Sequence, residues 1–261
     1  MLFLYRIFIN IVIFFSPLIV LIRILKGKED PSRYKEKFSF FSKRKKKGKL
    51  IWFHGASVGE ILSIVPLIQE LEKNKDIGQI LVTSNTLSSS KIFINLKLKK
   101  TIHQFYPIDH TYFVNKFLKY WSPSVAIFVD SEIWPTMLTN IKSKSISLVL
   151  LNARINKKSF RKWSRLGLIT KNLFSKFDLC LPSSNESRRH LNLLGAKNIK
   201  YIGNLKFTES EINRAILGGN LKKYLSSKKI WCASSTHRSE EEIAAKVHIR
   251  LKKKNKDVLT V

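Results

Sequence analysis

The residues best suited to chemistry follow a short apolar run, 50–54, and a turn of small residues. The turn reads Gly55-Ala56-Ser57-Val58-Gly59 and leads directly to Glu60, where a helical pattern begins. Small residues let the backbone approach a ligand closely, and the free N–H groups of a helix start attract anions. A carboxylate placed there can accept a proton from a substrate hydroxyl. Alternatively, Glu60 only complements the helix dipole, which favours its ionised form and makes it a weak base.

The same turn fits the Gly-x-Ser-x-Gly pattern of α/β-hydrolases, in which Ser57 would be the nucleophile. Such an enzyme needs an acid and then a histidine after later strands, and Asp130 followed by His190 or His237 has that order. However, the turn follows the first recognisable strand, whereas a hydrolase needs an earlier strand and loop for its oxyanion hole. Hydrolase chemistry is therefore an alternative interpretation.

Two further segments place polar side chains after apolar runs. Asp130 and Glu132 follow a strongly apolar run, so they are expected at the same edge of a parallel sheet as Glu60. They could instead begin a helix, since Asp130 is a preferred N-cap residue. Lys206 follows a Gly-Asn turn, although an isolated lysine means little in so basic a chain. The histidines lack metal-ligand spacing and no Asp-x-Asp element occurs, so no metal is implied.

Alternating apolar runs and amphipathic segments must position these side chains. The short apolar runs are 50–54, 79–83, 102–106, 125–129, 146–151, 178–181 and 199–202. The segments with helical periodicity are 61–71, 87–98, 111–120, 132–142, 160–176 and 185–194. Continuous apolar runs are typical of parallel strands buried on both faces. The alternation predicts a doubly wound α/β domain over residues 49–207, with Pro66 expected to kink or delay its first helix.

The remaining segments differ in composition. Residues 1–25 are almost entirely apolar and predict a membrane-associated helix, and residues 26–48 are a basic segment typical of the cytoplasmic side of a membrane. A buried helix followed by a solvated linker is the alternative. Residues 208–228 are polar and are expected to be a linker. Residues 229–261 begin a second strand–helix–strand pattern.

The amino-acid composition indicates a folded protein with anionic partners. The 261 residues include 48 Lys+Arg and 18 Asp+Glu, a net charge of +30, and 44% are hydrophobic. That apolar share excludes a disordered polycation, and the charge points to anionic partners. A basic nucleic-acid-binding protein is an alternative, although no recognisable nucleic-acid-binding motif is present. Two cysteines, Cys180 and Cys232, cannot form a disulfide framework and indicate a reduced compartment.

Eight features in order resemble one family closely and cover essentially the whole chain. They are the apolar N-terminus with its basic flank, Ser57-Val58-Gly59-Glu60, Tyr106-Pro107-Ile108-Asp109, Glu132-Ile133-Trp134-Pro135, Asn152-Ala153-Arg154, Leu194-Gly195-Ala196-Lys197-Asn198, Gly203-Asn204-Leu205-Lys206-Phe207 and Ala233-Ser234-Ser235-Thr236-His237. The chain is similar to the Kdo transferases of lipopolysaccharide synthesis. These membrane-associated glycosyltransferases move 3-deoxy-D-manno-octulosonic acid (Kdo) from CMP-Kdo to the lipid A precursor, lipid IVA.

The resemblance implies a GT-B architecture, in which two Rossmann-like domains face each other across a cleft. The N-terminal domain would bind the acceptor and the C-terminal domain the CMP-sugar. The resemblance further implies that Glu60 is the general base and that Glu132 and Lys206 stabilise the transition state, with inversion at the anomeric carbon. The residues with an implied substrate-binding role are Gly55, Ser57, Gly59, Arg154, Ser235, Thr236 and His237. No metal or cofactor is implied besides the donor substrate CMP-Kdo.

The resemblance also implies a location and partners. The protein would lie at the cytoplasmic face of a bacterial inner membrane and bind a phosphorylated glycolipid acceptor and anionic membrane lipid, but no nucleic acid. The chain departs from the family at its end, because residues 229–261 supply only the beginning of a second Rossmann-like domain. We therefore expect the chain as given to lack the donor site and to be inactive alone.

Overall fold

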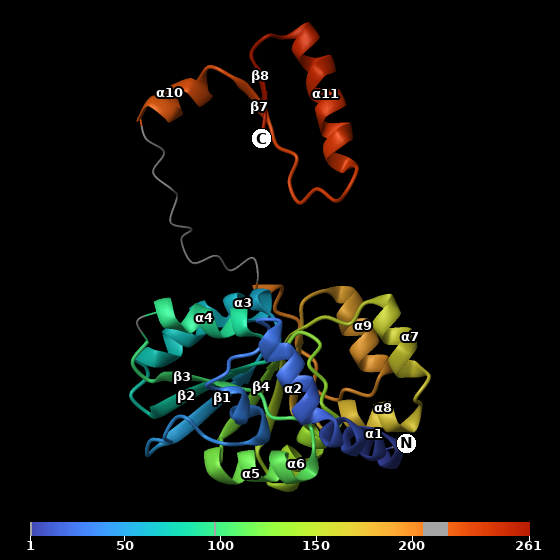
Figure 1. Cartoon of the computed structure of the whole chain (residues 1–261). Coiled ribbons are helices and arrows are strands. Elements are labelled where there is room, and N and C mark those ends of the chain that lie inside the picture. Colours follow the sequence, from blue (N-terminus) through green and yellow to red (C-terminus); the bar gives the residue numbers. More distant parts are fainter. Residues whose placement is uncertain (1, 97, 206–218) are drawn as a thin grey trace. The chain divides into compact units, whose positions relative to one another are not determined.

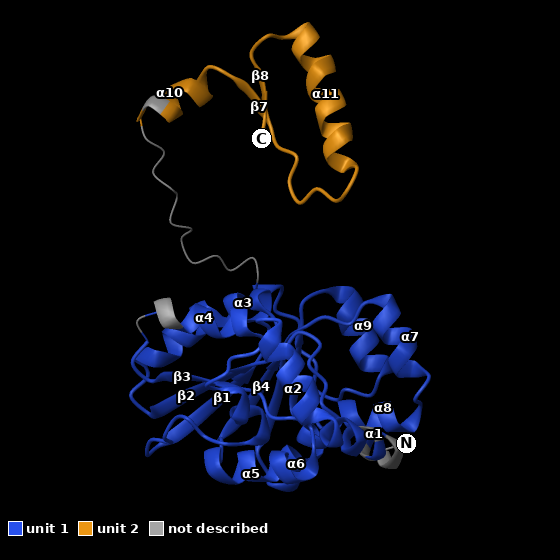
Figure 2. Ribbon diagram, in the orientation of Figure 1, with its two compact units in different colours: residues 1–210 blue, residues 211–261 orange. Residues whose placement is uncertain are grey.

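The computed structural model describes residues 2–96, 98–205 and 219–261. The chain divides into two compact units, residues 1–210 and residues 211–261 (Figures 1 and 2). The first unit contains the Gly-rich turn with Glu60, and also Glu132 and Arg154. Lys206 lies outside the described residues.

The first unit is built on a six-stranded parallel sheet with strand order β3-β2-β1-β4-β5-β6. Its strands are β1 (Lys49–His54), β2 (Ile77–Ser84), β3 (Thr101–Phe105), β4 (Val125–Val129), β5 (Ser147–Ala153) and β6 (Leu179–Pro182). The strand order reverses between β1 and β4, and ligands of doubly wound folds bind outside the carboxyl ends of the strands at this point. The predicted α/β fold class is confirmed.

Helices cover both faces of the sheet. In Figure 1, α3 (Val58–Lys73) and α4 (Leu87–Asn95) lie on one face, and α5 (Thr111–Trp121) and α6 (Pro135–Ser143) lie on the other. Neighbouring residues of β1 enter two separate cores: Trp52 packs in one cluster and Phe53 in the other. Successive side chains of a strand point to opposite faces, which explains the continuous apolar run. The helix α3 begins before Pro66 and continues past it, so the proline does not delay the helix.

Two predicted elements at the other end of the sheet are divided or reduced. The helix expected over 160–176 is two helices, α7 (Lys157–Ser164) and α8 (Leu168–Phe174), because Gly167 between them adopts a φ of 53° that a helix cannot contain. The strand expected over 199–202 is reduced to one bridge between Ile199 and Cys180. The helix α9 (Asn185–Leu193) follows β6 as predicted.

The apolar N-terminal segment forms two helices rather than one. These are α1 (Leu2–Phe14) and α2 (Ser16–Leu25), with Phe15 between them. Pro17 lies in the first turn of α2, where its missing N–H is tolerated. Many apolar side chains of this pair are exposed, including Ile11, Phe14 and Leu25. Among the described helices, none has the length and apolarity needed to cross a bilayer.

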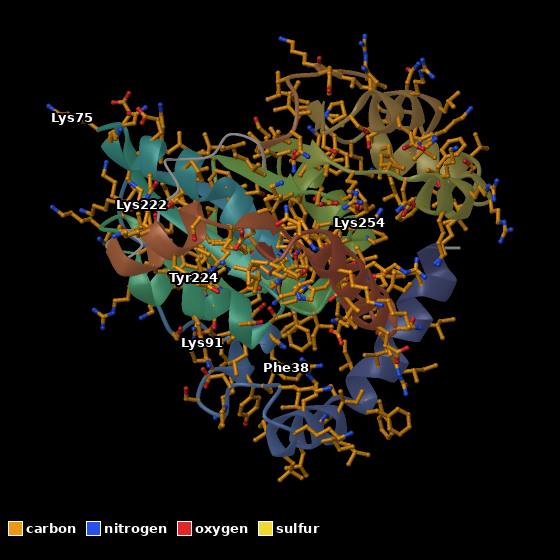
Figure 3. All side chains as sticks on the ribbon, turned by 90° about the horizontal axis from the view of Figure 1, so that it is seen from above. Phe38, Lys75, Lys91, Lys222, Tyr224 and Lys254 are labelled. Carbon is orange, nitrogen blue, oxygen red and sulfur yellow. The ribbon has the colours of Figure 1, made fainter. Side chains whose placement is uncertain are left out.

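The basic segment 26–48 packs against the sheet through buried acidic residues. A short 3₁₀ helix (Tyr34–Phe38) contains Glu36, whose side chain is 2% exposed. Its carboxylate accepts two hydrogen bonds from the Arg33 guanidinium, both 2.9 Å, and one from the Phe105 N–H of β3 at 2.8 Å. Both residues of this ion pair belong to the segment, and hydrogen bonds attach the pair to the edge strand: the Phe105 N–H donates to Glu36, and Arg33 donates to the His103 carbonyl oxygen at 3.0 Å. Other basic side chains extend into solvent around the unit, Lys75 among them (Figure 3).

The second unit contains α10 (Gly219–Ser226), β7 (Lys229–Trp231), α11 (Glu240–Lys254) and β8 (Val258–Thr260). The two strands pair in parallel, which agrees with the strand–helix–strand pattern expected over 229–261. Residues 219–226, expected as part of a linker, are helical. Residues 208–218 of that expected linker lie outside the described residues.

The buried pair predicts a large effect of Glu36 on stability. Glu36→Ala leaves the Arg33 charge and the Phe105 N–H without their acceptor, and breaking a buried ion pair from one side costs about 3–5 kcal/mol. The matched control is Glu70→Ala, because Glu70 pairs with Lys73 at the surface with a side chain 71% exposed, and such a pair contributes about 0–1 kcal/mol. Urea unfolding followed by tryptophan fluorescence measures both. Equal, small losses for the two variants would contradict the assignment.

Candidate active site

Two glutamates meet at the point where the strand order reverses. Glu60 follows β1 through the Gly-rich turn, and Glu132 follows β4, the parallel neighbour of β1 (Figure 1). Both side chains thus follow the carboxyl ends of adjacent parallel strands, and the negative charge of Glu132 is one of the smaller causes that raise the pKa of Glu60. The expectation that both lie at one edge of the sheet is confirmed.

The start of α3 holds the Glu60 carboxylate in place. Ser57 is the N-cap residue; its Oγ accepts the Glu60 N–H at 3.3 Å and donates to Glu60 Oε1 at 2.8 Å. The Ala56 N–H donates to the second oxygen, Oε2, at 2.7 Å. A Cβ on Gly55 would lie 3.2 Å from the Glu60 Cβ, so the small residue permits this close approach. Two hydrogen bonds to the half-buried carboxylate and one from the Glu60 N–H therefore fix the orientation of Glu60.

The pKa of Glu60 is raised above its ordinary value. Burial is the largest cause, and the negative charges of Glu132 and Asp130 add to it. The hydrogen bonds from Ser57 and Ala56 act in the opposite direction but do not outweigh these effects. The helix start alone would favour the ionised form, whereas desolvation, with smaller contributions from the like charges, raises the pKa of Glu60 above its ordinary value.

Glu132 lies in the loop before α6 and not within a helix, since Pro135 is the first helical residue. Its Oε2 is 3.3 Å from His54 Nε2 and accepts a hydrogen bond from Trp134 Nε1 at 2.8 Å. Burial raises the pKa of Glu132, but the nearby His54 ring and the Trp134 hydrogen bond outweigh it, so the pKa lies below its ordinary value. The pKa values of the two neighbouring glutamates are thus shifted in opposite directions, a pattern typical of carboxylates with different catalytic tasks.

Two supporting residues of this site were not identified from the sequence. His54, the last residue of β1, is fully buried, and its Nδ1 lies 3.0 Å from Thr83 Oγ1, which fixes the ring with Nε2 toward Glu132. Asp109 is 2% exposed and accepts the backbone N–H groups of Thr136 at 2.9 Å and Met137 at 2.7 Å, at the start of α6. Two features of the sequence could have identified them: His54 ends a predicted strand, and Asp109 ends the Tyr106-Pro107-Ile108-Asp109 motif.

A polar pocket of about 350 Å³ has Asp130, two residues before Glu132, in its lining. It lies at the carboxyl ends of β4, β5 and β6, and Asp130, Asn152, Arg154, Ser183 and Glu186 contribute to its lining. Asp130 and Asn152 adopt left-handed backbone conformations, with φ of 63° and 52°, where the chain leaves β4 and nears the end of β5. Such strained positions often occur at functional sites. Arg154, predicted to bind substrate, lies in this pocket.

The other predicted site residues are distributed over both units. Gly59 lies in the first turn of α3, and a Cβ built there would contact nothing within 4 Å, so this side of the turn is open. Ser235, Thr236 and His237 belong to the second unit, between β7 and α11. There the His237 N–H donates to Glu240 Oε2 at 2.7 Å.

The serine of the turn does not have the geometry of a hydrolase nucleophile. Ser57 has a relaxed φ of −110°, whereas the serine of that motif lies on a strained turn. Its Oγ is bonded to Glu60, and His190 is bonded through Nδ1 to the Ile155 carbonyl oxygen at 2.6 Å. The described residues contain no group of three or more His, Cys, Asp or Glu placed to hold a metal ion.

The coupling of the two carboxylates predicts a shift that NMR can measure. Glu132→Gln removes a negative charge beside Glu60, so the pKa of the Glu60 carboxyl should fall toward its ordinary value. A pH titration of the side-chain carboxyl resonance measures this pKa in the wild type and the variant. Glu70→Gln, at the exposed end of the same helix, should leave the Glu60 pKa unchanged. An unchanged or higher Glu60 pKa in Glu132→Gln would exclude the coupling.

Solved structures share the fold of the chain. A UDP-N-acetylglucosamine 2-epimerase aligns with a TM-score of 0.56 at 13% sequence identity, covering 82% of this chain and 63% of the epimerase. The Neisseria meningitidis UDP-GlcNAc 2-epimerase bound to UDP-GlcNAc aligns with a TM-score of 0.55, also at 13% identity, covering 82% of this chain and 64% of that structure. At this identity the likeness concerns the fold alone.

Sequence comparisons identify the family. Residues 32–209 match the family model of the 3-deoxy-D-manno-octulosonic-acid transferases. The chain is 36% identical to the 3-deoxy-D-manno-octulosonic acid transferase of Rickettsia bellii, over 90% of this chain and 56% of that protein. It is 35% identical to the probable mitochondrial 3-deoxy-D-manno-octulosonic acid transferase of Arabidopsis thaliana, over 99% of this chain and 60% of that protein. The chain thus spans a little over half the length of these relatives, and it belongs to the 3-deoxy-D-manno-octulosonic-acid (Kdo) transferase family.

Proposed function

We propose that this chain supplies the acceptor-binding half of a glycosyltransferase that transfers Kdo from CMP-Kdo to lipid IVA, the lipid A precursor, in lipopolysaccharide synthesis. Membership of the family supports this class of reaction. The observation that carries the mechanism is the pair of neighbouring glutamates with oppositely shifted pKa values, Glu60 and Glu132.

In this proposal Glu60 is the general base. The acceptor hydroxyl oxygen attacks the anomeric carbon of Kdo and transfers its proton to the Glu60 carboxylate. The bond between that carbon and the CMP phosphate oxygen breaks, and CMP leaves from the opposite face, so the anomeric configuration inverts. The raised pKa of Glu60 supports the role, because a stronger base accepts the proton more readily.

Glu132 stabilises the transition state in this proposal. Glycosyl transfer builds positive charge on the sugar ring as the leaving group departs. A carboxylate kept ionised by His54 and Trp134 lies next to the base and attracts that charge. Because His54 and the Trp134 indole already hold Glu132, little reorganisation is needed as the charge develops.

The remaining proposed roles concern the phosphate and the two substrates. Lys206 would neutralise charge on the CMP phosphate; this role rests on the sequence motif, since the residue lies outside the described ones. Arg154 and the polar pocket beside it would hold the acceptor head group. Ser235, Thr236 and His237 would bind the CMP-sugar from the second unit.

We also place the protein at the cytoplasmic face of the bacterial inner membrane. The exposed apolar side chains of α1 and α2 support attachment to a bilayer surface. The excess of basic residues supports attraction to anionic head groups, to which each Lys or Arg near the surface contributes about 1 kcal/mol.

The base assignment predicts a selective loss of turnover. In the intact transferase, Glu60→Gln removes the proton acceptor, and kcat for Kdo transfer to lipid IVA should fall roughly 10²–10⁴-fold while acceptor binding persists. The assay uses CMP-Kdo and lipid IVA, with acceptor binding measured separately by titration. Glu70→Gln, on the same helix but exposed, should retain the wild-type rate. An undiminished kcat in Glu60→Gln would refute the role of Glu60.

A further inference from the structure

An apolar pocket of about 360 Å³ lies behind the loop that carries Glu132. Its lining comes from three places: Tyr5 of α1, the Ile133-Trp134-Pro135 segment, and Trp163, Leu166, Ile169 and Leu173 around α7 and α8. Figure 1 shows α1 beside α8, and both helices contribute residues to this lining. The pocket is as large as the smaller ligand sites of proteins, which begin at about 300 Å³.

The polar atoms of two lining residues are already engaged elsewhere. The Tyr5 hydroxyl donates to Asp109 Oδ2 at 2.6 Å, and Trp134 Nε1 donates to Glu132 Oε2 at 2.8 Å. Both rings therefore present carbon surface to the pocket. A hydrocarbon chain gains from burial on such a surface and requires no hydrogen-bond partner.

The pocket and the carboxylates share one side chain. Trp134 lines the pocket with its ring, and its N–H holds the carboxylate that acts on Glu60. One ligand with a hydrocarbon part and a polar head can therefore occupy the pocket while its head lies near the glutamates. This continuity argues against a separate partner such as a peptide helix.

Three exposed basic residues are sequence neighbours of residues that line the same pocket. Arg161, Lys162 and Arg165 are exposed next to the lining residues Trp163 and Leu166. Within the part of the chain that the structure describes, none of these three cations forms an ion pair. An apolar pocket with unpaired basic side chains nearby is complementary to an amphiphile that has a hydrocarbon part and an anionic head.

We propose that this pocket binds an acyl chain of the phosphorylated glycolipid acceptor, an inference that rests on the proposed function. The chain enters between α1 and α8, the phosphorylated head faces the cations, and the attacking sugar hydroxyl reaches Glu60. The pocket thereby positions a lipid acceptor and discriminates it from a free sugar phosphate.

Ile169→Asn tests the proposal, and Leu168→Asn is its matched control. Ile169 lines the pocket, whereas its neighbour Leu168 is 83% exposed and does not. When the hydrocarbon chain binds, the Asn side chain introduced at this position loses its water and gains no hydrogen-bond partner in exchange. In the intact transferase, Ile169→Asn should raise KM for lipid IVA at least about tenfold, since one buried methylene already changes specificity by that factor. Its kcat, and its KM for the deacylated acceptor, should stay unchanged, and Leu168→Asn should behave as the wild type.

Two results would overturn the acyl-chain assignment. One is an unchanged KM for lipid IVA in Ile169→Asn; the other is an equal rise for the acylated and deacylated acceptors, which would indicate a role in head-group binding or folding. Binding to vesicles of phosphatidylcholine and phosphatidylglycerol should be the same in Ile169→Asn and the wild type. A loss of vesicle binding with unchanged KM would assign the pocket to the bilayer instead.

A binding assay keeps this proposal separate from the transferase activity. Dibromostearate should quench the tryptophan emission of the 261-residue chain, because Trp134 and Trp163 line the pocket. Unbrominated stearate should not quench it, and Ile169→Asn should weaken the quenching. Absence of quenching would overturn the pocket assignment, whereas absence of transfer to both acceptors by the wild type would refute the proposed function alone.

Discussion

The site depends on two partly buried carboxylates that the sheet places at one edge, where burial and their hydrogen bonds shift their pKa values in opposite directions. The order of the strands reverses between β1 and β4, so the segments that leave these strands diverge around one point, and each carries a glutamate there. Two like charges in a half-buried place cannot both keep their ordinary pKa. The two pKa values are shifted unequally: His54 and Trp134 stabilise the charge on Glu132, whereas burial, with smaller contributions from Glu132 and Asp130, raises the pKa of Glu60 and makes it the stronger base.

This unequal arrangement requires a rigid support for the Glu132 loop. Asp109 binds the first N–H groups of α6, and the Tyr5 hydroxyl binds Asp109 in turn, so α1, the loop after β3 and the start of α6 are linked. Burial raises the pKa of Asp109 to about 6, while these hydrogen bonds act in the opposite direction. The ring of Tyr106 stacks on His54 with centroids 3.8 Å apart, which fixes the imidazole from its face. The N-terminal helices are therefore part of the support of the site as well as an apolar surface.

The local pattern was enough to predict the sheet and the position of Glu60. Apolar runs such as 125–129 became buried strands because parallel strands are covered on both faces. Ser57 and the small residues before Glu60 indicate a helix start. The hydrogen bonds that hold the Glu60 carboxylate come from Ala56 and Ser57, which are at most four residues away. Position at a strand end then sufficed to place Glu132 beside Glu60.

Interactions between distant residues could not be predicted in the same way. The pKa of Glu60 is raised first by burial and then by Asp130 and Glu132, which are about seventy residues away, whereas the helix dipole that argues for the opposite shift is local. The contact of His54 with Glu132 and that of Asp109 with Met137 likewise arise only from packing. The spacing of apolar residues predicts one helix through Gly167, but it contains no information on backbone angles. The positive φ of Gly167 divides this segment into two helices.

The most direct test of the central claim is the pH dependence of kcat/KM for Kdo transfer by the intact protein, compared between the wild type and Glu132→Gln. If Glu60 is the base and Glu132 raises its pKa, the acid limb of the profile lies above the range of an ordinary glutamate in the wild type. In Glu132→Gln the same limb moves to lower pH, together with a fall in rate from the lost stabilisation of positive charge. An acid limb that stays at the same pH in the variant would contradict the account.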